Sequence, residues 1–141
     1  MLYSEANITE LLPQREPMVM VSNLLKCEEK LYVTSFKIKE DNIFVKDGLM
    51  REPGLIENIA QTAAAGAGYS CIISNKKVPI GYIGAIKNLE IRSLPEVNSE
   101  ITTHVIIEYE VMNATLIKGI VYYKEIPIAE CDMKIFLNPV I

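Results

Sequence analysis

The most promising chemical group in this sequence is a carboxylate with an amide beside it. Glu57 and Gln61 are four residues apart, so in a helix they lie on the same face. Residues 58–75 carry no charge, and the positive end of a helix favours a carboxylate near its start. Glu57 can then act as a general acid or base, with Gln61 hydrogen-bonded to it or to a substrate. Position alone leaves two plain alternatives open: a solvated first-turn glutamate, and an amide that satisfies a buried polar neighbour.

Backbone groups at the same helix start are a second candidate. The N–H groups of Gly54 and Leu55 belong to the first turn, where helical amides lack partners within the helix. They can hold a substrate oxygen on which negative charge builds. Every helix start has such amides, so the pattern indicates substrate binding only in combination with Glu57.

Other common chemistries are poorly supported by this sequence. His104 is the only histidine, and the three cysteines are widely spaced, so we expect no metal site and no cofactor. Cys27, Cys71 and Cys131 are interpreted as buried, reduced thiols. Asp47 precedes Gly48, a pair typical of a turn, although its carboxyl group is also a candidate acid.

Charge and hydropathy limit the partners and the location. The net charge is -4 and no basic run is present, which disfavours nucleic-acid binding. The uncharged segment 58–75 is rich in Ala, Gly, Ser and Thr, so we expect a packed helix and not a membrane span. The first residues lack the pattern of a secretory signal, and we expect a cytoplasmic protein.

The elements that must position these groups are predicted from hydrophobic periodicity. Asn7, Glu10 and Pro13 mark a short helix, and Pro53 suits the first turn of a long one. Strands are predicted over residues 18–26, 31–39, 79–91, 100–111, 115–124 and from 127 onward. In the strand at 100–111, one face holds Ile101, Thr103, Val105, Ile107, Tyr109 and Val111, whereas His104, Glu108 and Glu110 lie on the other.

The long helix is expected to be buried. Its apolar face is predicted to hold Leu55, Ile56, Ile59, Ala60, Ala63 and Ala67. Two interior glycines, Gly66 and Gly68, cost roughly 1 kcal/mol each relative to alanine, which close approach of a surrounding sheet would offset. The order of elements indicates one α+β domain over residues 1–141, an antiparallel sheet wrapped around one long helix. Such a sheet has an edge strand at which two subunits can pair.

Three segments, in order along the chain, resemble the 3-hydroxyacyl-acyl-carrier-protein dehydratases. Residues 12–18 read Leu-Pro-Gln-Arg-Glu-Pro-Met and resemble the Leu-Pro-His-Arg-x-Pro opening of those enzymes. Residues 57–61, Glu-Asn-Ile-Ala-Gln, resemble their central-helix signature, and residues 84–95 are similar to a strand and turn. The Asp-Gly pair at 47–48 resembles the divergent branch associated with aryl-polyene and flexirubin pigments.

The resemblance implies a hotdog fold, a dimer, and a tunnel for an acyl chain tethered to acyl carrier protein. It implies removal of water from a 3-hydroxyacyl thioester, in fatty-acid or polyene synthesis. On this basis Glu57 is the catalytic candidate, and Gly54, Leu55 and Gln61 are the substrate-binding candidates.

The chain departs from that family at its histidines. No histidine lies between Phe44 and Gly48, where the ordinary enzymes carry their catalytic one, and Gln14 replaces the histidine of the opening motif. Glutamine cannot exchange a proton near neutral pH. His104, on the polar face of a predicted strand, is assigned a surface or edge role.

Three hypotheses follow, and they leave open whether the chain alone is an enzyme. The first is a subunit that supplies Glu57 to a site shared with a histidine-bearing dehydratase paralogue, as a heterodimer in place of a homodimer. The second is a non-catalytic subunit that binds acyl groups or acts as a scaffold. The third is a thioesterase acting on acyl-coenzyme A or acyl carrier protein, in which the Glu57 carboxylate activates water.

Overall fold

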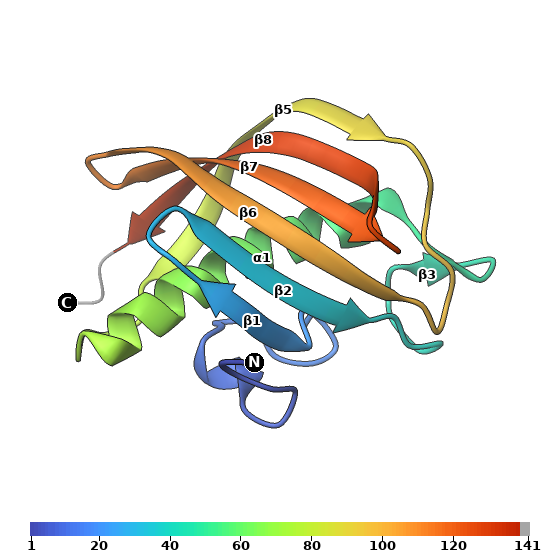
Figure 1. The fold of residues 1–141 in the computed structure, drawn as a ribbon, viewed down its shortest axis with the longest axis horizontal. Coiled ribbons are helices and arrows are strands. Elements are labelled where there is room, and N and C mark those ends of the chain that lie inside the picture. The colour runs from blue at the N-terminus through green and yellow to red at the C-terminus, as the bar shows by residue number, and fades with distance from the viewer. Residues whose placement is uncertain (139–141) are drawn as a thin grey trace.

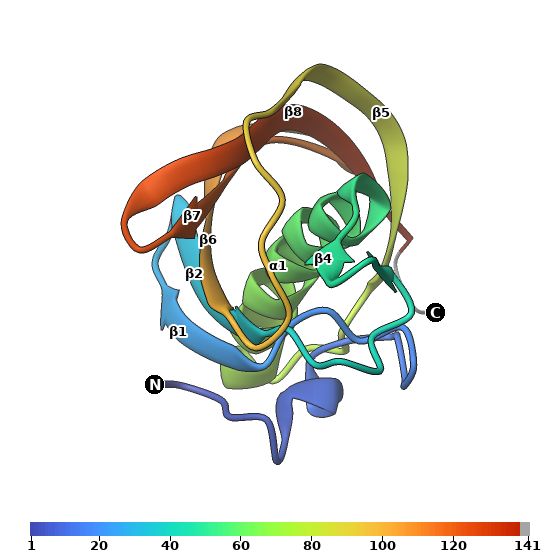
Figure 2. The same ribbon diagram turned by 90° about the vertical axis from the view of Figure 1, so that its right-hand side faces the viewer.

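One long helix, α1 (Glu52–Ile73), lies against the concave face of an antiparallel sheet that curves around it (Figures 1 and 2). The computed structural model describes residues 1–138. Six strands form this sheet in the order β1-β2-β6-β7-β8-β5. Their bounds are Asn23–Cys27 (β1), Leu31–Lys37 (β2), Ile80–Ile91 (β5), Glu100–Val111 (β6), Ala114–Tyr123 (β7) and Ile126–Asn138 (β8). The predicted α+β architecture, a sheet around a single long helix, is confirmed.

Two small elements complete the fold. The predicted first helix is only a 3-10 turn, η1 (Ile8–Glu10). A two-stranded ribbon of β3 (Val45–Lys46) and β4 (Leu49–Met50) precedes α1 and was not predicted. Asp47 and Gly48 form its two-residue turn with φ of 56° and 77°, so the turn interpretation of this pair is correct.

The predicted strand at 18–26 is wrong over its first half, because β1 begins only at Asn23. The backbone of Met20 is instead bonded to side chains of the helix. Its N–H donates to Gln61 Oε1 at 2.6 Å, and its carbonyl accepts from Asn58 Nδ2 at 2.8 Å. The segment is therefore largely buried as predicted, but Met20 bonds to α1, and the bond to a neighbouring strand is made at the end of the segment, by the Ser22 N–H to the Ser35 carbonyl of β2 at 2.9 Å.

Polar side chains also join α1 to the sheet, so its buried face is less aliphatic than predicted. Asn58, Gln61 and Thr62 are fully buried, whereas Ile56, Ala60 and Ala67 are only partly so. Thr62 Oγ1 donates to the Asn58 carbonyl and lies 2.7 Å from Thr34 Oγ1 of β2. Thr103 Oγ1 of β6 donates to Asn58 Oδ1 at 2.5 Å. These bonds fix the rotation of the helix relative to the sheet.

The two helix glycines are explained by close approach, as predicted, although only one faces the sheet. A Cβ atom at Gly66 would lie 2.1 Å from the ring of Tyr32 in β2. At Gly68 it would lie 2.6 Å from the Leu11 carbonyl oxygen, in the segment after η1. Side chains at these positions would push the helix away from both neighbours.

A bulge changes the faces of β6 near its end. The register with β7 shifts between Ile107 and Tyr109, which reverses the alternation beyond that point. Tyr109 and Val111, predicted on the same face as Ile107, are therefore exposed, whereas Ile101, Thr103, Val105 and Ile107 are buried. Among the cysteines only Cys131 is buried; Cys27 and Cys71 are half-buried, which corrects the prediction for those two.

The two edges of the sheet differ. Residues 2 and 3 cover β1, with the N–H of Leu2 bonded to the Leu24 carbonyl at 2.8 Å and a bridge between Tyr3 and Leu24. The other edge strand, β5, pairs only with β8 among the described residues. It exposes large apolar side chains, namely Ile80, Tyr82, Ile83, Ile86 and Leu89. An open apolar edge of this kind is typical of a surface that another chain covers.

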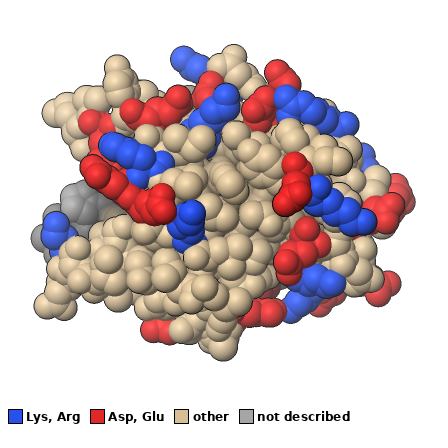
Figure 3. All heavy atoms as spheres, in the orientation of Figure 1, with Lys and Arg blue, Asp and Glu red and all other residues tan. Residues whose placement is uncertain are grey.

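Acidic and basic side chains are mixed over the face shown in Figure 3, without a continuous basic band. Among residues 1–138, no helix combines the length and the apolar character needed to cross a bilayer.

Candidate functional site

Gln61 holds the Glu57 carboxylate in place. Gln61 Nε2 donates to Glu57 Oε2 at 2.8 Å and to the Met18 carbonyl at 2.8 Å, while its Oε1 accepts from the Met20 N–H. Both hydrogens of the amide and one acceptor position of its oxygen are thus used within the protein. Glu57 Oε1 has no hydrogen-bond partner among the described residues and is left for a molecule that approaches the carboxylate. The predicted pairing of Glu57 with Gln61 on one helical face is present.

Glu57 lines a cavity of about 280 Å³ between α1 and the sheet. The floor is made of small helix residues, Ala60, Ala63, Ala64 and Ala67. One wall comes from β5, including Gly81, Tyr82 and Ile83, and another from the inner face of the sheet, including Ile107, Ile117 and Ile135. The small helix side chains leave the space that larger ones would fill, and the lining suits an acyl chain.

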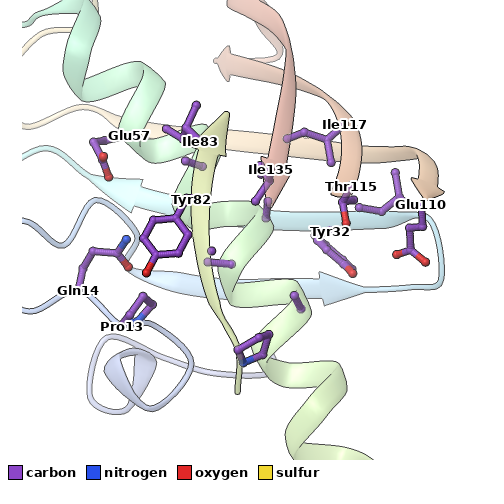
Figure 4. A pocket seen from close by; sticks show the side chains of 17 residues that line it. Pro13, Gln14, Tyr32, Glu57, Tyr82, Ile83, Glu110, Thr115, Ile117 and Ile135 are labelled. Atoms are coloured by element: carbon purple, nitrogen blue, oxygen red, sulfur yellow. The ribbon is translucent and has the colours of Figure 1, made fainter. Parts of the chain in front are cut away.

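Polar groups mark both ends of this cavity (Figure 4). Glu57, Gln14 and Tyr82 lie at one end, and Tyr32, Thr115 and Glu110 at the other. Glu110 reaches the cavity because of the β6 bulge, although simple alternation places it on the outer face with His104. Burial, and then the nearby Cys27 and Glu110, raise the pKa of Tyr32 to about 12, so its hydroxyl is neutral at physiological pH.

The predicted substrate-binding residues lie around Glu57 without lining the cavity. Gly54, Leu55 and Gln61 are buried and are absent from its walls. The Gly54 N–H donates to the Arg51 carbonyl at 2.9 Å, so a substrate oxygen would have to share this amide. A Cβ atom at Gly54 would lie 2.8 Å from Phe44 Cβ, which explains the glycine. Their roles toward a substrate stay predictions.

His104 and Asp47, the other titratable candidates from the sequence, lie away from the cavity. His104 is on the outer face of β6, a central strand, with its ring centroid 4.9 Å from that of Tyr122. Burial, with a smaller effect of Lys26, lowers the pKa of His104. Neither His104 nor Asp47 lines the cavity. In residues 1–138 no three His, Cys, Asp or Glu side chains are grouped so that they could hold a metal ion.

Sequence reasoning missed the residues that β-strands bring to the cavity. Tyr82 and Tyr32 are far from Glu57 in sequence, and only the curvature of the sheet places them around the same space. The alternation in β2, which puts Tyr32 on the same face as Thr34, was the one signal for Tyr32.

A curved antiparallel sheet around one central helix, with a carboxylate of that helix in an apolar cavity, defines a hotdog-fold protein. The model of the ApeP-like family, described as ApeP dehydratase, matches residues 6–139. The chain therefore belongs to this divergent, dehydratase-like family, and the resemblance seen in its motifs is confirmed at that level. No curated protein matches it at the sequence level.

Solved structures confirm the fold. A chain of the dehydratase heterocomplex ApeI:P from Xenorhabdus doucetiae is similar with a TM-score of 0.87 and 12% identity, over 93% of this chain and 90% of that chain. An HP0420 homologue from Helicobacter felis has a TM-score of 0.70 and 16% identity, over 95% of this chain and 87% of that chain. A hypothetical thioesterase with coenzyme A from Streptococcus pneumoniae has a TM-score of 0.66 and 8% identity, over 83% of this chain and 85% of that chain.

Proposed function

We propose that this chain, acting as one domain over residues 1–141, is the Glu57-donating subunit of a heterodimeric dehydratase. Its substrates are 3-hydroxyacyl groups carried by acyl carrier protein in fatty-acid or polyene synthesis. The observation that carries the proposal is an incomplete site: Glu57 is oriented by Gln61 in an acyl-sized cavity, and no histidine of this chain lines that cavity.

Dehydration needs two groups that exchange protons. A base takes the proton from C2, the electron pair of that C–H bond forms the C2–C3 double bond, and the C3–O bond breaks. The hydroxyl leaves as water when an acid gives it a proton. Glu57 is the group of this chain that supplies this proton. The C2 proton goes to an imidazole, which titrates near neutral pH and which this chain lacks at the cavity.

The open edge of the sheet supports a partner at this place. Tyr82 and Ile83 belong to β5, which is at once a wall of the cavity and the exposed apolar edge. A subunit that covers β5 therefore lies next to the cavity, where its histidine can complete the site. At the opposite edge, residues 2 and 3 already occupy positions along β1.

The similar structure from Xenorhabdus doucetiae supports a mixed assembly. That protein is described as a dehydratase heterocomplex, and the family to which this chain belongs carries the name of one of its components. Acyl carrier protein is proposed as the carrier because the motifs resemble dehydratases that act on it.

The test is mass spectrometry of 3-hydroxyacyl-carrier protein incubated with this chain, with its paralogue, and with both. We expect loss of one water by the mixture beyond the rate of the paralogue alone. Glu57→Gln should lower this excess rate about a hundredfold or more, as is typical for loss of a general acid or base. Glu52→Gln is the matched control, because Glu52 is in the first turn of the same helix and exposed.

Other outcomes decide between the alternatives. Exclusive homodimers in the mixture, or an excess rate that survives Glu57→Gln, would refute the shared site. Binding of acyl-carrier protein without any excess water loss would favour a scaffold subunit. Release of free acid and thiol would instead favour a thioesterase.

A further inference from the structure

Gln14, like Tyr82, is a polar residue at the Glu57 end of the cavity to which the proposed reaction assigns no role. Its Oε1 atom is buried and accepts no hydrogen bond from the described residues. Among residues 1–138 it is the one buried side-chain oxygen or nitrogen without a hydrogen-bond partner. Buried polar atoms nearly always have a partner, so the donor is expected in a molecule that enters the cavity.

The loop that carries Gln14 is tied down on both sides. Arg15 Nη1 donates to the Leu12 carbonyl at 2.7 Å and to the Gln14 carbonyl at 2.8 Å. Downstream, the Met18 carbonyl accepts from Gln61 Nε2, the same atom that binds Glu57. The backbone of Gln14 therefore has a fixed position relative to the Glu57 carboxylate, and both side chains reach the same end of the cavity (Figure 4).

We propose that Gln14 Oε1 accepts a hydrogen bond from the 3-hydroxyl group of the substrate and makes the site selective for 3-hydroxyacyl over saturated acyl chains. This inference rests on the proposed dehydratase function. A hydroxyl group is both donor and acceptor, so its hydrogen can point to Gln14 while a lone pair accepts the proton of Glu57. The neutral amide suits this role, because a second carboxylate there would compete for that proton.

A hydrogen bond to Gln14 from another donor of a carrier-bound substrate would not produce this selectivity. The amide N–H groups of the phosphopantetheine arm are identical in hydroxylated and saturated substrates. A bond from one of them to Gln14 would strengthen the binding of both equally. The change in the ratio of the two dissociation constants when the Gln14 acceptor is removed thus isolates its contact with the hydroxyl.

The experiment measures binding of 3-hydroxyoctanoyl- and octanoyl-carrier protein to the heterodimer. The paralogue carries alanine in place of its catalytic histidine, so that neither probe is consumed. We expect the unaltered chain to prefer the hydroxylated probe, with the Gln14 contact contributing about three- to tenfold, the usual worth of one net hydrogen bond. Gln14→Met keeps the length of the side chain without an acceptor and should lower the preference by this factor, whereas the contact of the hydroxyl with Glu57 remains. Glu16→Met, on the same loop but outside the cavity, should retain the preference.

The results separate this inference from the function on which it rests. A preference as large in Gln14→Met as in the unaltered chain, or equal binding of both probes by the unaltered complex, would overturn the role of Gln14 and leave the dehydratase assignment standing. Failure of both probes to bind the unaltered complex would overturn both. Circular dichroism of the Gln14→Met chain, with a thermal midpoint close to that of Glu16→Met, shows that a lowered preference does not come from unfolding.

Discussion

Gln61→Leu is the substitution that most directly tests how strongly the Gln61 side chain joins α1 to the segment before β1. Leucine matches glutamine in size but removes three hydrogen bonds, to Met20 N–H, to the Met18 carbonyl and to Glu57. Met20 is fully buried, so its N–H is left without a partner at a cost of about 1–3 kcal/mol. Met18 is partly exposed, so water can replace the bond to its carbonyl, and the half-buried Glu57 is likewise reachable. Each of these two losses costs about 0.5–1.5 kcal/mol.

Burial of the added apolar surface offsets part of this sum, which leaves a net loss of about 2–4 kcal/mol in the free energy of unfolding. Urea unfolding at pH 7, followed by circular dichroism, measures it. Glu57→Gln is the control, since it affects one of the three bonds and should cost below about 1 kcal/mol. A loss below about 1 kcal/mol in the free energy of unfolding for Gln61→Leu would refute the idea that Gln61 holds this segment to α1.

Three further predictions concern packing and titration. Gly66→Ala should lower the free energy of unfolding, measured in urea, by about 1–3 kcal/mol, because the Cβ of alanine would overlap the ring of Tyr32. Alanine is the better helix former, so an increase in this free energy would show that the ring moves freely. The folded-state pKa of His104 is lowered, so its contribution is present above the unfolded value of 6.5 and is lost as pH falls through the folded pKa. Replacing it with glutamine should therefore make stability less dependent on pH between 7 and 5, and an unchanged pH profile would contradict this assignment. Burial raises the pKa of Cys131 to about 11, so in native protein at pH 8 this thiol should react with a disulfide reagent more slowly than those of Cys27 and Cys71. Peptide mass mapping gives the order of labelling, and faster labelling of Cys131 would argue against its burial.

The long β-strands and the central helix were predictable because their side chains repeat with clear periods. β6 matches its predicted bounds, and α1 begins one residue before Pro53. The β3–β4 ribbon was missed because two-residue strands show no period. The faces of β6 beyond Ile107 were wrong because a bulge depends on the neighbouring strand and leaves no mark on alternation.

The candidate site was predictable where its residues share one element. Glu57 and Gln61 are helical neighbours, so spacing alone brings them together. The contacts from Gln61 to Met18 and Met20 span more than 40 residues, and no local pattern indicates them. The same long range explains why the predicted strand at residues 18–22 is wrong: the apolar run is visible in the sequence, but the hydrogen-bond partners of Met18 and Met20 are not.

A site divided between two different subunits is tested most directly by complementation. This chain, which has no histidine at its cavity, is mixed with a paralogue whose own helix carboxylate has been replaced by its amide, and loss of water from 3-hydroxyacyl-carrier protein is followed by mass spectrometry. We predict that each protein alone is inactive and that the mixture is active, with the activity abolished by Glu57→Gln. A mixture that forms the heterodimer but stays inactive would contradict the shared site.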